Sequence, residues 1–371
     1  MSLLPDSKKR WTIAFRPSAG GLGGDKLFRD DKYIHVGDAS HWMEPGLHLA
    51  QFGARNGYDF HTDDMVDMGK ADALILGEML VTPKELAELR RRYRQLRIIL
   101  QITETPIGRA WTFDPANHRG YDAVLTYNDH LRGQSGYFIY KLPTGGLGSW
   151  GRLRPGRSWE ERKITCMVAN VPNPASWFPR RSGLGMLKAG WRFTRRTWWN
   201  YVTEGGSIYR ERLSVASCLA RMFPGDFDIY GPGWDGLDDV AIRTAWHGPW
   251  LGNKLELLDR YRFNIAYENC RNDVGYISEK IFDAFLAGTV PVYLGNQRIQ
   301  EFVPAGSFVD ARKFKSPREL GIFLKEMPKQ QWEEMRAAGD EFLRNGTDEH
   351  FGAAQYANAV IAALRFVLQR P

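Results

Sequence analysis

The region 261–310 alternates apolar runs with one amphipathic run, and this pattern constrains the fold more than any other stretch. Residues 263–267 form a short apolar run that is typical of a buried strand. Residues 278–287 follow with apolar side chains at helical spacing, and Gly288 stands where a glycine ends a helix. A second apolar run, 289–294, comes next. Strand, polar turn, helix and strand in this order predict a parallel α/β layer structure.

The first turn of that helix combines an acidic and a basic side chain. Ser278 is a suitable N-cap, which places Glu279 and Lys280 in the first turn. The backbone N–H groups and the lysine suit a phosphate, and the carboxylate suits a ribose diol. Glutamate there is also ordinary capping because it complements the helix dipole, whereas lysine opposes the dipole. The pair therefore indicates either a sugar-nucleotide site or routine capping.

Length and composition limit the class of protein. A chain of 371 residues fits two domains of about 150–200 residues better than one core. With 43% hydrophobic and 25% charged residues, we expect a soluble globular protein. No run approaches the roughly 20 apolar residues of a membrane span, and residues 1–10 lack the apolar core of a secretion signal. Three widely spaced cysteines predict reduced thiols in a cytosolic protein.

The net charge of +7 favours anionic partners, which include nucleic acid, acidic lipid and nucleotide diphosphate. Charge alone does not choose among these partners.

Two α/β domains are expected along the chain. We predict an N-terminal Rossmann-like domain over 1–150, a second over 151–348, and a C-terminal helix within 349–371 that returns to the first domain. A segment rich in Gly, Pro and Arg, 143–157, is the predicted linker. The predicted strands are 11–16, 71–76, 98–102, 122–127, 163–169, 227–230, 263–267 and 289–294, and the predicted helices are 47–56, 82–96, 209–222, 254–261, 278–287, one from 316, and 351–368.

The segment 263–314 resembles the donor-binding half of the family 10 glycosyltransferases, the α1,3/α1,4-fucosyltransferases. That family has a strand ending in F-E-N, then Y-[IV]-T-E-K, a helix, A-G-[TA]-[VI]-P-[VI], and F-[VN]-P-x-x-[SA]-F-[VI]. Tyr267 and Ser278 replace a usual Phe and a usual Thr. The residues that match are Glu268, Asn269, Tyr276, Glu279, Lys280, Gly288, Pro291, Gly295, Phe302, Pro304, Ser307 and Phe308. The match is firm over 255–315 and weaker upstream.

The resemblance implies a GT-B fold, with two facing Rossmann-like domains, and a site for GDP-fucose. It implies that Lys280 contacts the diphosphate, that Glu279 contacts the ribose hydroxyls and that Tyr276 lines the nucleotide pocket. Glu268 and Asn269 belong to the same donor-binding set. Cationic side chains and a helix N-terminus can supply the charge that a metal would supply, so we expect no metal cofactor.

Further donor contacts are expected upstream. Asn170 resembles an asparagine of the family's S-N turn near the phosphates. Arg210 and Arg212 resemble an R-x-R-x-Y segment that precedes a strand ending in glycine, and we prefer Arg210 as the diphosphate ligand. The alternative for this pair is a solvated helix start.

Glu104 is the candidate catalytic base. It follows the predicted strand 98–102, and ligands bind at the carboxyl ends of parallel strands. The sequence Glu104-Thr105-Pro106 resembles the family's E-[SN]-P motif, whose glutamate is the proposed base. An inverting sugar transfer needs one carboxylate to take the proton of the acceptor hydroxyl. The alternative is a glutamate at a strand end that faces water.

Other motifs carry weaker signals. Residues 180–199 hold six basic residues, no acidic residue and several aromatic ones, which suits anionic lipid, a lipid-linked acceptor or nucleic acid, or simply a basic insertion. The glycine-rich turn 20–24 lacks a Walker lysine. Asp226 and Asp228 spell D-x-D, but they flank a strand start, so we interpret them as structural. The eight histidines show no zinc-ligand spacing with the cysteines.

The sequence therefore predicts inverting, α1,3-fucosyltransferase-like transfer of L-fucose from GDP-β-L-fucose to a hydroxyl of an oligosaccharide or polysaccharide acceptor, which could be lipid-linked. We expect a cytoplasmic protein, peripheral on the inner face of a bacterial membrane, with no nucleic-acid partner. Two alternatives stay open. One is the same fold with another GDP- or UDP-linked sugar. The other is a basic nucleic-acid-binding protein, against which Glu279 and Glu104 argue.

Overall fold

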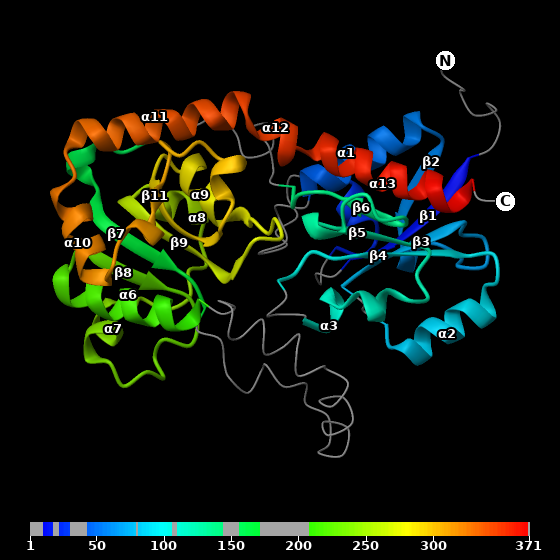
Figure 1. Ribbon diagram of the computed structural model, residues 1–371, viewed down its shortest axis with the longest axis horizontal. Helices are drawn as coiled ribbons and strands as arrows, with labels where there is room; N and C mark the ends of the chain where they lie inside the picture. Colours follow the sequence, from blue (N-terminus) through cyan, green and yellow to red (C-terminus); the bar gives the residue numbers. More distant parts are fainter. Residues whose placement is uncertain are drawn as a thin grey trace. The chain divides into compact units, whose positions relative to one another are not determined.

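The computed structural model divides into two compact units (Figure 1). The described residues are 10–17, 22–29, 43–78, 81–105, 110–143, 156–170 and 208–369. The first unit contains the described residues of 10–104, 110–143 and 347–369, and the second contains Thr105 and those of 156–346. The basic segment 180–199, most of the predicted linker 143–157 and the start of the glycine-rich turn 20–24 lie outside the described residues.

The first unit is built on a six-stranded parallel sheet with the order β2-β1-β3-β4-β5-β6. Ile13 lies opposite Ala73, and Phe15 lies opposite Ile75. The strands are β1 (Trp11–Arg16), β2 (Tyr58–Thr62), β3 (Ala73–Gly77), β4 (Arg97–Gln101), β5 (Ala123–Thr126) and β6 (Tyr137–Ile139). Period-2 alternation sends neighbouring side chains to opposite faces, so both faces of this sheet are apolar and buried.

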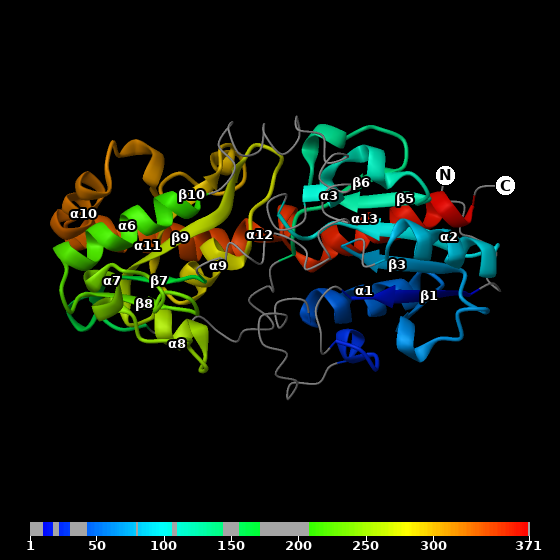
Figure 2. The ribbon, with the colours of Figure 1, turned by 90° about the horizontal axis from the view of Figure 1, so that it is seen from below.

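Helices cover both faces of the first sheet. α1 (Met43–Arg55) and α13 (Ala353–Leu368) lie side by side on one face, with Leu49 and Ile361 in the core (Figure 2). The Tyr356 hydroxyl of α13 donates to Gln101 Oε1 over 3.0 Å. α2 (Pro83–Arg92) packs on the other face through Leu86. The short helices are α3 (Ala110–Phe113) and α12 (Thr347–His350).

The start of α2 confirms a sequence prediction, and its end corrects one. The helix expected from residue 82 begins there, because Thr82 and Glu85 form a capping box and Pro83 occupies the first turn. The helix ends at Arg92 rather than near 96, because Tyr93 leaves the helical conformation (φ −122°, ψ 75°) and the chain then turns into β4.

The second unit is built on a five-stranded parallel sheet with the order β11-β10-β9-β7-β8. The strands are β7 (Lys163–Val168), β8 (Phe227–Tyr230), β9 (Tyr261–Asn272), β10 (Val290–Asn296) and β11 (Val309–Asp310). The polar turn predicted directly after residue 267 is wrong. β9 stays extended to Asn272, which pairs with Asn296 across a register shift in β10.

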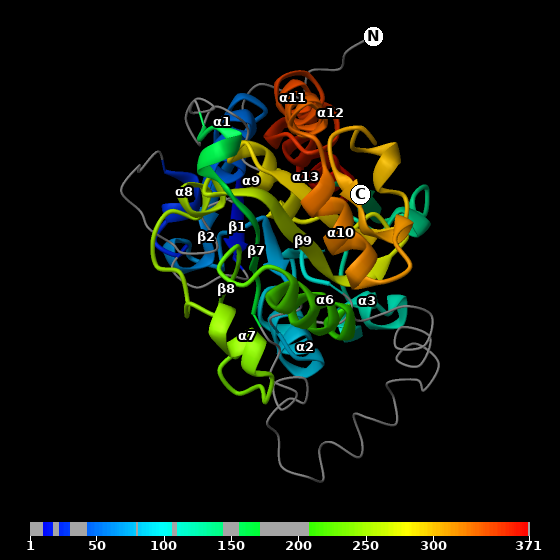
Figure 3. The same ribbon diagram turned by 90° about the vertical axis from the view of Figure 1, so that its left-hand side faces the viewer.

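Helices also cover both faces of the second sheet (Figure 3). α6 and α10 pack together with α7 on one face, and α8 and α9 pack on the other. The helices are α6 (Tyr209–Met222), α7 (Val240–Ala245), α8 (Lys254–Leu258), α9 (Glu279–Leu286), α10 (Pro317–Glu326) and α11 (Lys329–Asn345). The predicted C-terminal glycine of α9 is confirmed, since Gly288 has φ +64° and its N–H donates to Phe285 O over 2.9 Å.

The sequence pattern missed α3, α7, α11, α12, β2, β6 and β11, and it extended α8 to residue 261. α8 stops at Leu258 because Tyr261 already begins β9. Among the helices of the described ranges, none combines the length and the apolar composition that a membrane crossing requires.

We predict that α13 is an essential part of the first core. Ile361→Ala removes a side chain that is 2% exposed, so it should lower the free energy of unfolding by about 2–5 kcal/mol. Urea denaturation followed by tryptophan fluorescence measures this. Asn358→Ala, an exposed change on the same helix, should stay within about 0.5 kcal/mol of the parent. Equal effects of the two changes would contradict the packing of α13.

Candidate functional site

A buried carboxylate joins the end of β9 to the start of α9. The Glu268 side chain is 0% exposed. Its Oε1 accepts from the Ser278 backbone N–H over 2.8 Å, and its Oε2 accepts from the Ser278 hydroxyl over 2.6 Å. A buried carboxylate is costly unless it is hydrogen-bonded and paired with charge. Glu268 therefore fixes the N-cap residue of α9 against the sheet.

Lys280 supplies the positive charge that Glu268 needs. Its Nζ lies 3.5 Å from Glu268 Oε2 and 3.8 Å from Glu279 Oε1, and it donates to the Ser278 hydroxyl over 3.2 Å. The Lys280 side chain is 18% exposed, so the ammonium lies at the edge of the buried network. One cation between two carboxylates, beside a helix N-terminus, can bind an anion by exchanging one of those contacts.

Glu279 has a second cationic neighbour. Lys254 Nζ lies 4.0 Å from Glu279 Oε1 and 2.6 Å from Asp283 Oδ2. The Glu279 side chain is 32% exposed, so its oxygens can reach a hydroxyl of a bound molecule. The pair at 279 and 280, predicted from sequence as one constellation, is indeed held together in space.

Arg212, and not Arg210, lies against the end of β9. Its guanidinium donates to Tyr267 O and to Asn269 Oδ1, each over 2.7 Å. Burial lowers the pKa of Arg212, and nearby Glu268 opposes that shift. Within the described part of the chain, its Nε has no hydrogen-bond partner. Arg210 is exposed, and its expected diphosphate contact stays a prediction.

A sequence signal for Arg212 existed. The buried positions of α6 include 212, 215, 216 and 219, which is a helical spacing, so helical phase places Arg212 on the buried face. Our preference for Arg210 rested on motif order alone.

The turn that follows β9 is fixed by one asparagine. The Tyr276 N–H donates to Asn272 Oδ1 over 3.1 Å, and Asn272 Nδ2 donates to Tyr276 O over 3.2 Å. Tyr276 is 6% exposed. Asn269 is exposed, and its side chain accepts from Arg212. The turn thus starts only after Asn272, where the side-chain amide replaces the strand ladder.

Asn170 and Gly231 end the neighbouring strands. Asn170 is exposed just beyond β7, and Trp234 Nε1 donates to the adjacent Ala169 O over 2.6 Å. Gly231 follows β8 with φ +123°, and a Cβ there would lie 2.2 Å from Ala169 O. Because β9, β7 and β8 are adjacent and parallel, their carboxyl ends share one edge of the sheet. The donor-site candidates of the second unit all lie at that edge.

Glu104 belongs to the first unit, in the turn after β4. Its side chain is exposed, whereas its backbone is held on both sides. The Glu104 N–H donates to Glu78 Oε1 over 2.6 Å, and the Tyr127 hydroxyl donates to Glu104 O over 2.6 Å. Sequence reasoning missed Glu78. Burial raises the pKa of Glu78, and hydrogen bonds from Thr103 and Glu104 oppose that shift.

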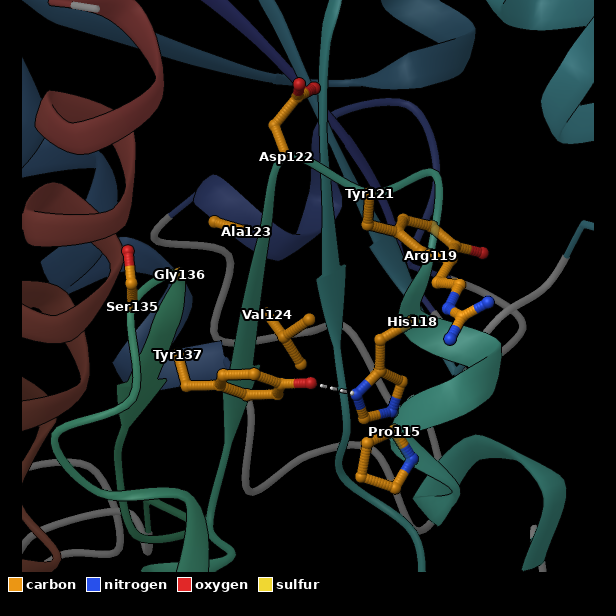
Figure 4. Close-up of a pocket in the computed structure, with 10 residues that line it drawn as sticks. All are labelled: Pro115, His118, Arg119, Tyr121, Asp122, Ala123, Val124, Ser135, Gly136 and Tyr137. Carbon is orange, nitrogen blue, oxygen red and sulfur yellow. Dashed lines mark hydrogen bonds between the residues drawn. The ribbon is translucent and has the colours of Figure 1, made fainter.

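The pocket drawn in Figure 4 lies elsewhere on the first sheet. It has a volume of about 210 Å³ and is lined by residues that include Asp122, before β5, and Tyr137, the first residue of β6. The Tyr137 hydroxyl lies 3.0 Å from His118 Nδ1. These are the amino ends of the strands, whereas Glu104 follows a carboxyl end. The pocket is therefore not part of the Glu104 site.

We next consider side chains that could bind a metal ion. In the described ranges, no group of three or more His, Cys, Asp or Glu residues is placed to hold an ion. Asp228 of the D-x-D sequence is bound by protein groups: Lys163 Nζ and the Tyr261 hydroxyl each lie 2.6 Å from Oδ2, and His247 Nε2 lies 2.8 Å from Oδ1.

The segment around β9 and α9 is similar to known enzymes. A family model described as glycosyltransferase family 10 (fucosyltransferase), C-terminal part, matches residues 247–336. This family 10 segment contains Glu268, Asn269, Tyr276, Glu279 and Lys280, whereas Asn170, Arg210 and Glu104 lie before it.

Curated relatives match a limited part of the chain. A mouse (Mus musculus) 4-galactosyl-N-acetylglucosaminide 3-alpha-L-fucosyltransferase 9 is 40% identical over 79 residues, which are 21% of this chain and 22% of the relative. An alpha-(1,4)-fucosyltransferase of Arabidopsis thaliana is 39% identical over 88 residues, which are 24% of this chain and 21% of the relative. The chain therefore aligns with only about a fifth of the length of these relatives.

The fold extends the likeness beyond the family 10 segment. A crystal structure of an alpha1,3-fucosyltransferase with GDP-fucose superposes with a TM-score of 0.55 and 15% identity, over 100% of this chain and 94% of that chain. At this identity the superposition shows the fold alone. The two parallel-sheet units are those of a GT-B glycosyltransferase fold, which confirms the predicted fold class.

We predict that the Ser278 hydroxyl is needed by the buried carboxylate. Ser278→Ala removes one donor from Glu268 and the N-cap of α9, so it should lower the free energy of unfolding by about 1–3 kcal/mol. Ser278→Thr, the matched control, keeps the hydroxyl and should stay near the parent. Thermal and urea unfolding measure both variants. A Thr variant as unstable as the Ala variant would contradict the role of the hydroxyl.

Proposed function

We propose that this chain is an inverting glycosyltransferase that moves L-fucose from GDP-β-L-fucose to a hydroxyl of an oligosaccharide or polysaccharide. The observation that carries the proposal is the contact network of Glu268, Ser278 and Lys280 at the start of α9. This network lies inside the segment that matches the fucosyltransferase family, whose curated relatives here are named as 3-alpha-L- and alpha-(1,4)-fucosyltransferases.

The proposed donor site combines cations with one accessible carboxylate. Lys280 and exposed Arg210 bind the diphosphate, and Glu279 binds the ribose hydroxyls. Tyr276 lines the nucleotide pocket, and Asn170 contributes to the turn beside the phosphates. Glu268 and Arg212 do not contact the donor themselves but position residues that do. Glu268 holds Lys280 in place, and Arg212 holds the Asn269 side chain. Negative charge develops on the departing GDP, so a pre-oriented cation lowers the barrier.

Glu104 is the proposed base. As the acceptor oxygen attacks the anomeric carbon, its proton passes to the Glu104 carboxylate, the bond from that carbon to the phosphate oxygen breaks, and GDP leaves. Attack on the face opposite the leaving group inverts the configuration. The held backbone and exposed side chain of Glu104 suit this task, because a base must reach the acceptor hydroxyl from a fixed position.

The acceptor class and the location of the protein are proposed from sequence alone. The basic and aromatic segment 180–199, which lies outside the described residues, suits a lipid-linked acceptor or the anionic inner face of a bacterial membrane. We accordingly propose a cytoplasmic, peripheral protein. No metal is required for the proposed reaction, so transfer should persist in excess EDTA.

Ligand-induced stabilisation tests the donor. At a hundredfold excess over Kd, GDP or GDP-fucose should stabilise the fold by about 2.7 kcal/mol, read as a rise in melting temperature. UDP and a single-stranded oligonucleotide serve as comparison ligands. Stabilisation by UDP alone would indicate that the donor is a UDP-linked sugar and not GDP-fucose. Stabilisation by the oligonucleotide alone would support nucleic-acid binding and overturn the transferase proposal.

Loss of the Lys280 charge should weaken donor binding. We expect Lys280→Ala to raise the Kd for GDP about 10- to 100-fold, which corresponds to a lost charge-assisted contact of roughly 1.5–3 kcal/mol. Isothermal titration calorimetry measures this. Lys329→Ala is the matched control, because Lys329 also pairs with a glutamate, Glu160, at 2.7 Å, but on exposed side chains at the start of α11. GDP binding unchanged in Lys280→Ala would remove this lysine from the site.

Glu104 can be separated from the donor site. Glu104→Ala and the isosteric Glu104→Gln should leave GDP affinity intact and lower kcat by about 10²–10⁴-fold, the usual contribution of a general base. Transfer is followed by GDP release with a panel of oligosaccharide acceptors. Glu88→Ala, an exposed glutamate on α2, is the control and should retain full activity. Full transfer by Glu104→Gln would exclude this residue as the base.

A further inference from the structure

Glu78, the first residue after β3, has an unusual conformation for a glutamate. Its φ is +58°, in the left-handed region, which disfavours residues with a long side chain. It is also buried, with 2% of its surface exposed. A buried carboxyl and a left-handed backbone are each unfavourable, and such features persist where the surrounding structure requires them.

Among the residues that the structure describes, the hydrogen bonds of the Glu78 carboxyl all come from one turn. Oε1 accepts from the Thr103 backbone N–H, from the Thr103 hydroxyl and from the Glu104 N–H at 2.6 Å. Oε2 is buried and has no hydrogen-bond partner among the described residues. The Glu78 N–H donates to Gln101 O over 2.8 Å, which continues the pairing of β3 with β4. Glu78 thus joins two adjacent strand ends through a single oxygen.

Residues that follow two other strands of the sheet also donate hydrogen bonds to the 102–104 turn. The Tyr127 hydroxyl, just after β5, donates to Glu104 O over 2.6 Å. The Tyr140 hydroxyl, just after β6, donates to Ile102 O over 2.7 Å. Side chains that follow β3, β5 and β6 therefore fix the backbone from 102 to 104. The Glu104 side chain alone is left exposed, so the turn presents one carboxylate from a fixed backbone.

We propose that Glu78 is a positioning residue for Glu104, and that its buried carboxyl holds the 103–104 backbone so that the Glu104 carboxylate meets the acceptor hydroxyl; this rests on the proposed function. Displacement of a catalytic group by about 1 Å can lower a rate 100-fold, so fixing the backbone of Glu104 should raise the rate of transfer. A purely structural Glu78 would instead stabilise the first sheet without regard to the identity of residue 104.

Four variants separate these two roles. Glu78→Ala removes all three accepted hydrogen bonds, whereas Glu78→Gln keeps an acceptor oxygen at the same length. Tyr127→Phe removes the hydroxyl that donates to Glu104 O and keeps the ring. Thr103→Val removes the side-chain donor and keeps the backbone N–H. Each is made in the full chain and in the Glu104→Ala background.

We expect Glu78→Ala to lower kcat about 100-fold with GDP affinity unchanged. Glu78→Gln should restore the rate to within about 10-fold of the parent, and Tyr127→Phe should reduce kcat on its own. In the Glu104→Ala background, Glu78→Ala should have no further effect on the residual rate, since residues acting as a unit are non-additive. Equal losses of rate in the two backgrounds would overturn the positioning role.

Amide hydrogen exchange gives a second readout that needs no activity. Exchange at the Thr103 and Glu104 amides should accelerate at least 10-fold in Glu78→Ala and stay near the parent in Glu78→Gln. Unchanged exchange at both amides would overturn the proposal. If Glu78→Ala does not fold, Thr103→Val and Tyr127→Phe, which each remove one of these hydrogen bonds, provide the comparison.

The two proposals fail in different ways. If the parent chain neither binds GDP nor transfers fucose, the proposed function is wrong, and the exchange data still decide whether Glu78 holds the turn. If the parent transfers fucose but substitution of Glu78 changes neither kcat nor amide exchange at Thr103 and Glu104, only the positioning role is wrong.

Discussion

The buried Glu268 carboxylate is the interaction on which the second unit's candidate site depends. It lies at the carboxyl-end side of β9, accepts two hydrogen bonds from Ser278 and pairs with Lys280 at 3.5 Å. A charge in this position is tolerated only when its partners are placed well. The need to satisfy Glu268 therefore orients the first turn of α9, and that turn carries the residues proposed to bind the donor. Gly295 accommodates it, since a Cβ there would lie 2.4 Å from Glu268 Cγ.

The first unit uses the same device around Glu104. Again a buried carboxyl, here Glu78, accepts hydrogen bonds from a nearby turn, and one of them comes from the backbone N–H of Glu104, the proposed base. In both units the buried acid lies at or beyond the carboxyl-end part of a parallel strand, and the proposed reacting or binding group is more exposed than the acid that holds it. Rigid strands thus determine the position of the more exposed groups, which is the usual arrangement in parallel α/β folds.

Local patterns predicted much of this architecture, and the errors have physical causes. The Ser278 N-cap and the Gly288 stop of α9 were predicted correctly because they depend on residues within four positions of each other. The buried contact of Arg212 with Asn269 was not predicted, although the phase of α6 buries position 212, and the diphosphate contact expected of Arg210 stays a prediction. Glu78 had no readable signal. A left-handed backbone is predicted from glycine or asparagine, not from glutamate. The hydrogen-bond partners of Glu78 also lie 25 and 26 residues away in the sequence.

The sequence by itself determined the alternation of strands and helices, the similarity of residues 247–336 to glycosyltransferase family 10 and the pairing of Glu279 with Lys280 in one helical turn. The alternation and the pairing follow from periodicity and short-range spacing, and the family similarity follows from the matching residues. Only the tertiary structure decided that β9 continues to Asn272, that Arg212 binds Asn269 and that Glu78 holds Glu104. Strand order sets which distant residues become neighbours, and burial then selects the hydrogen bonds that must form.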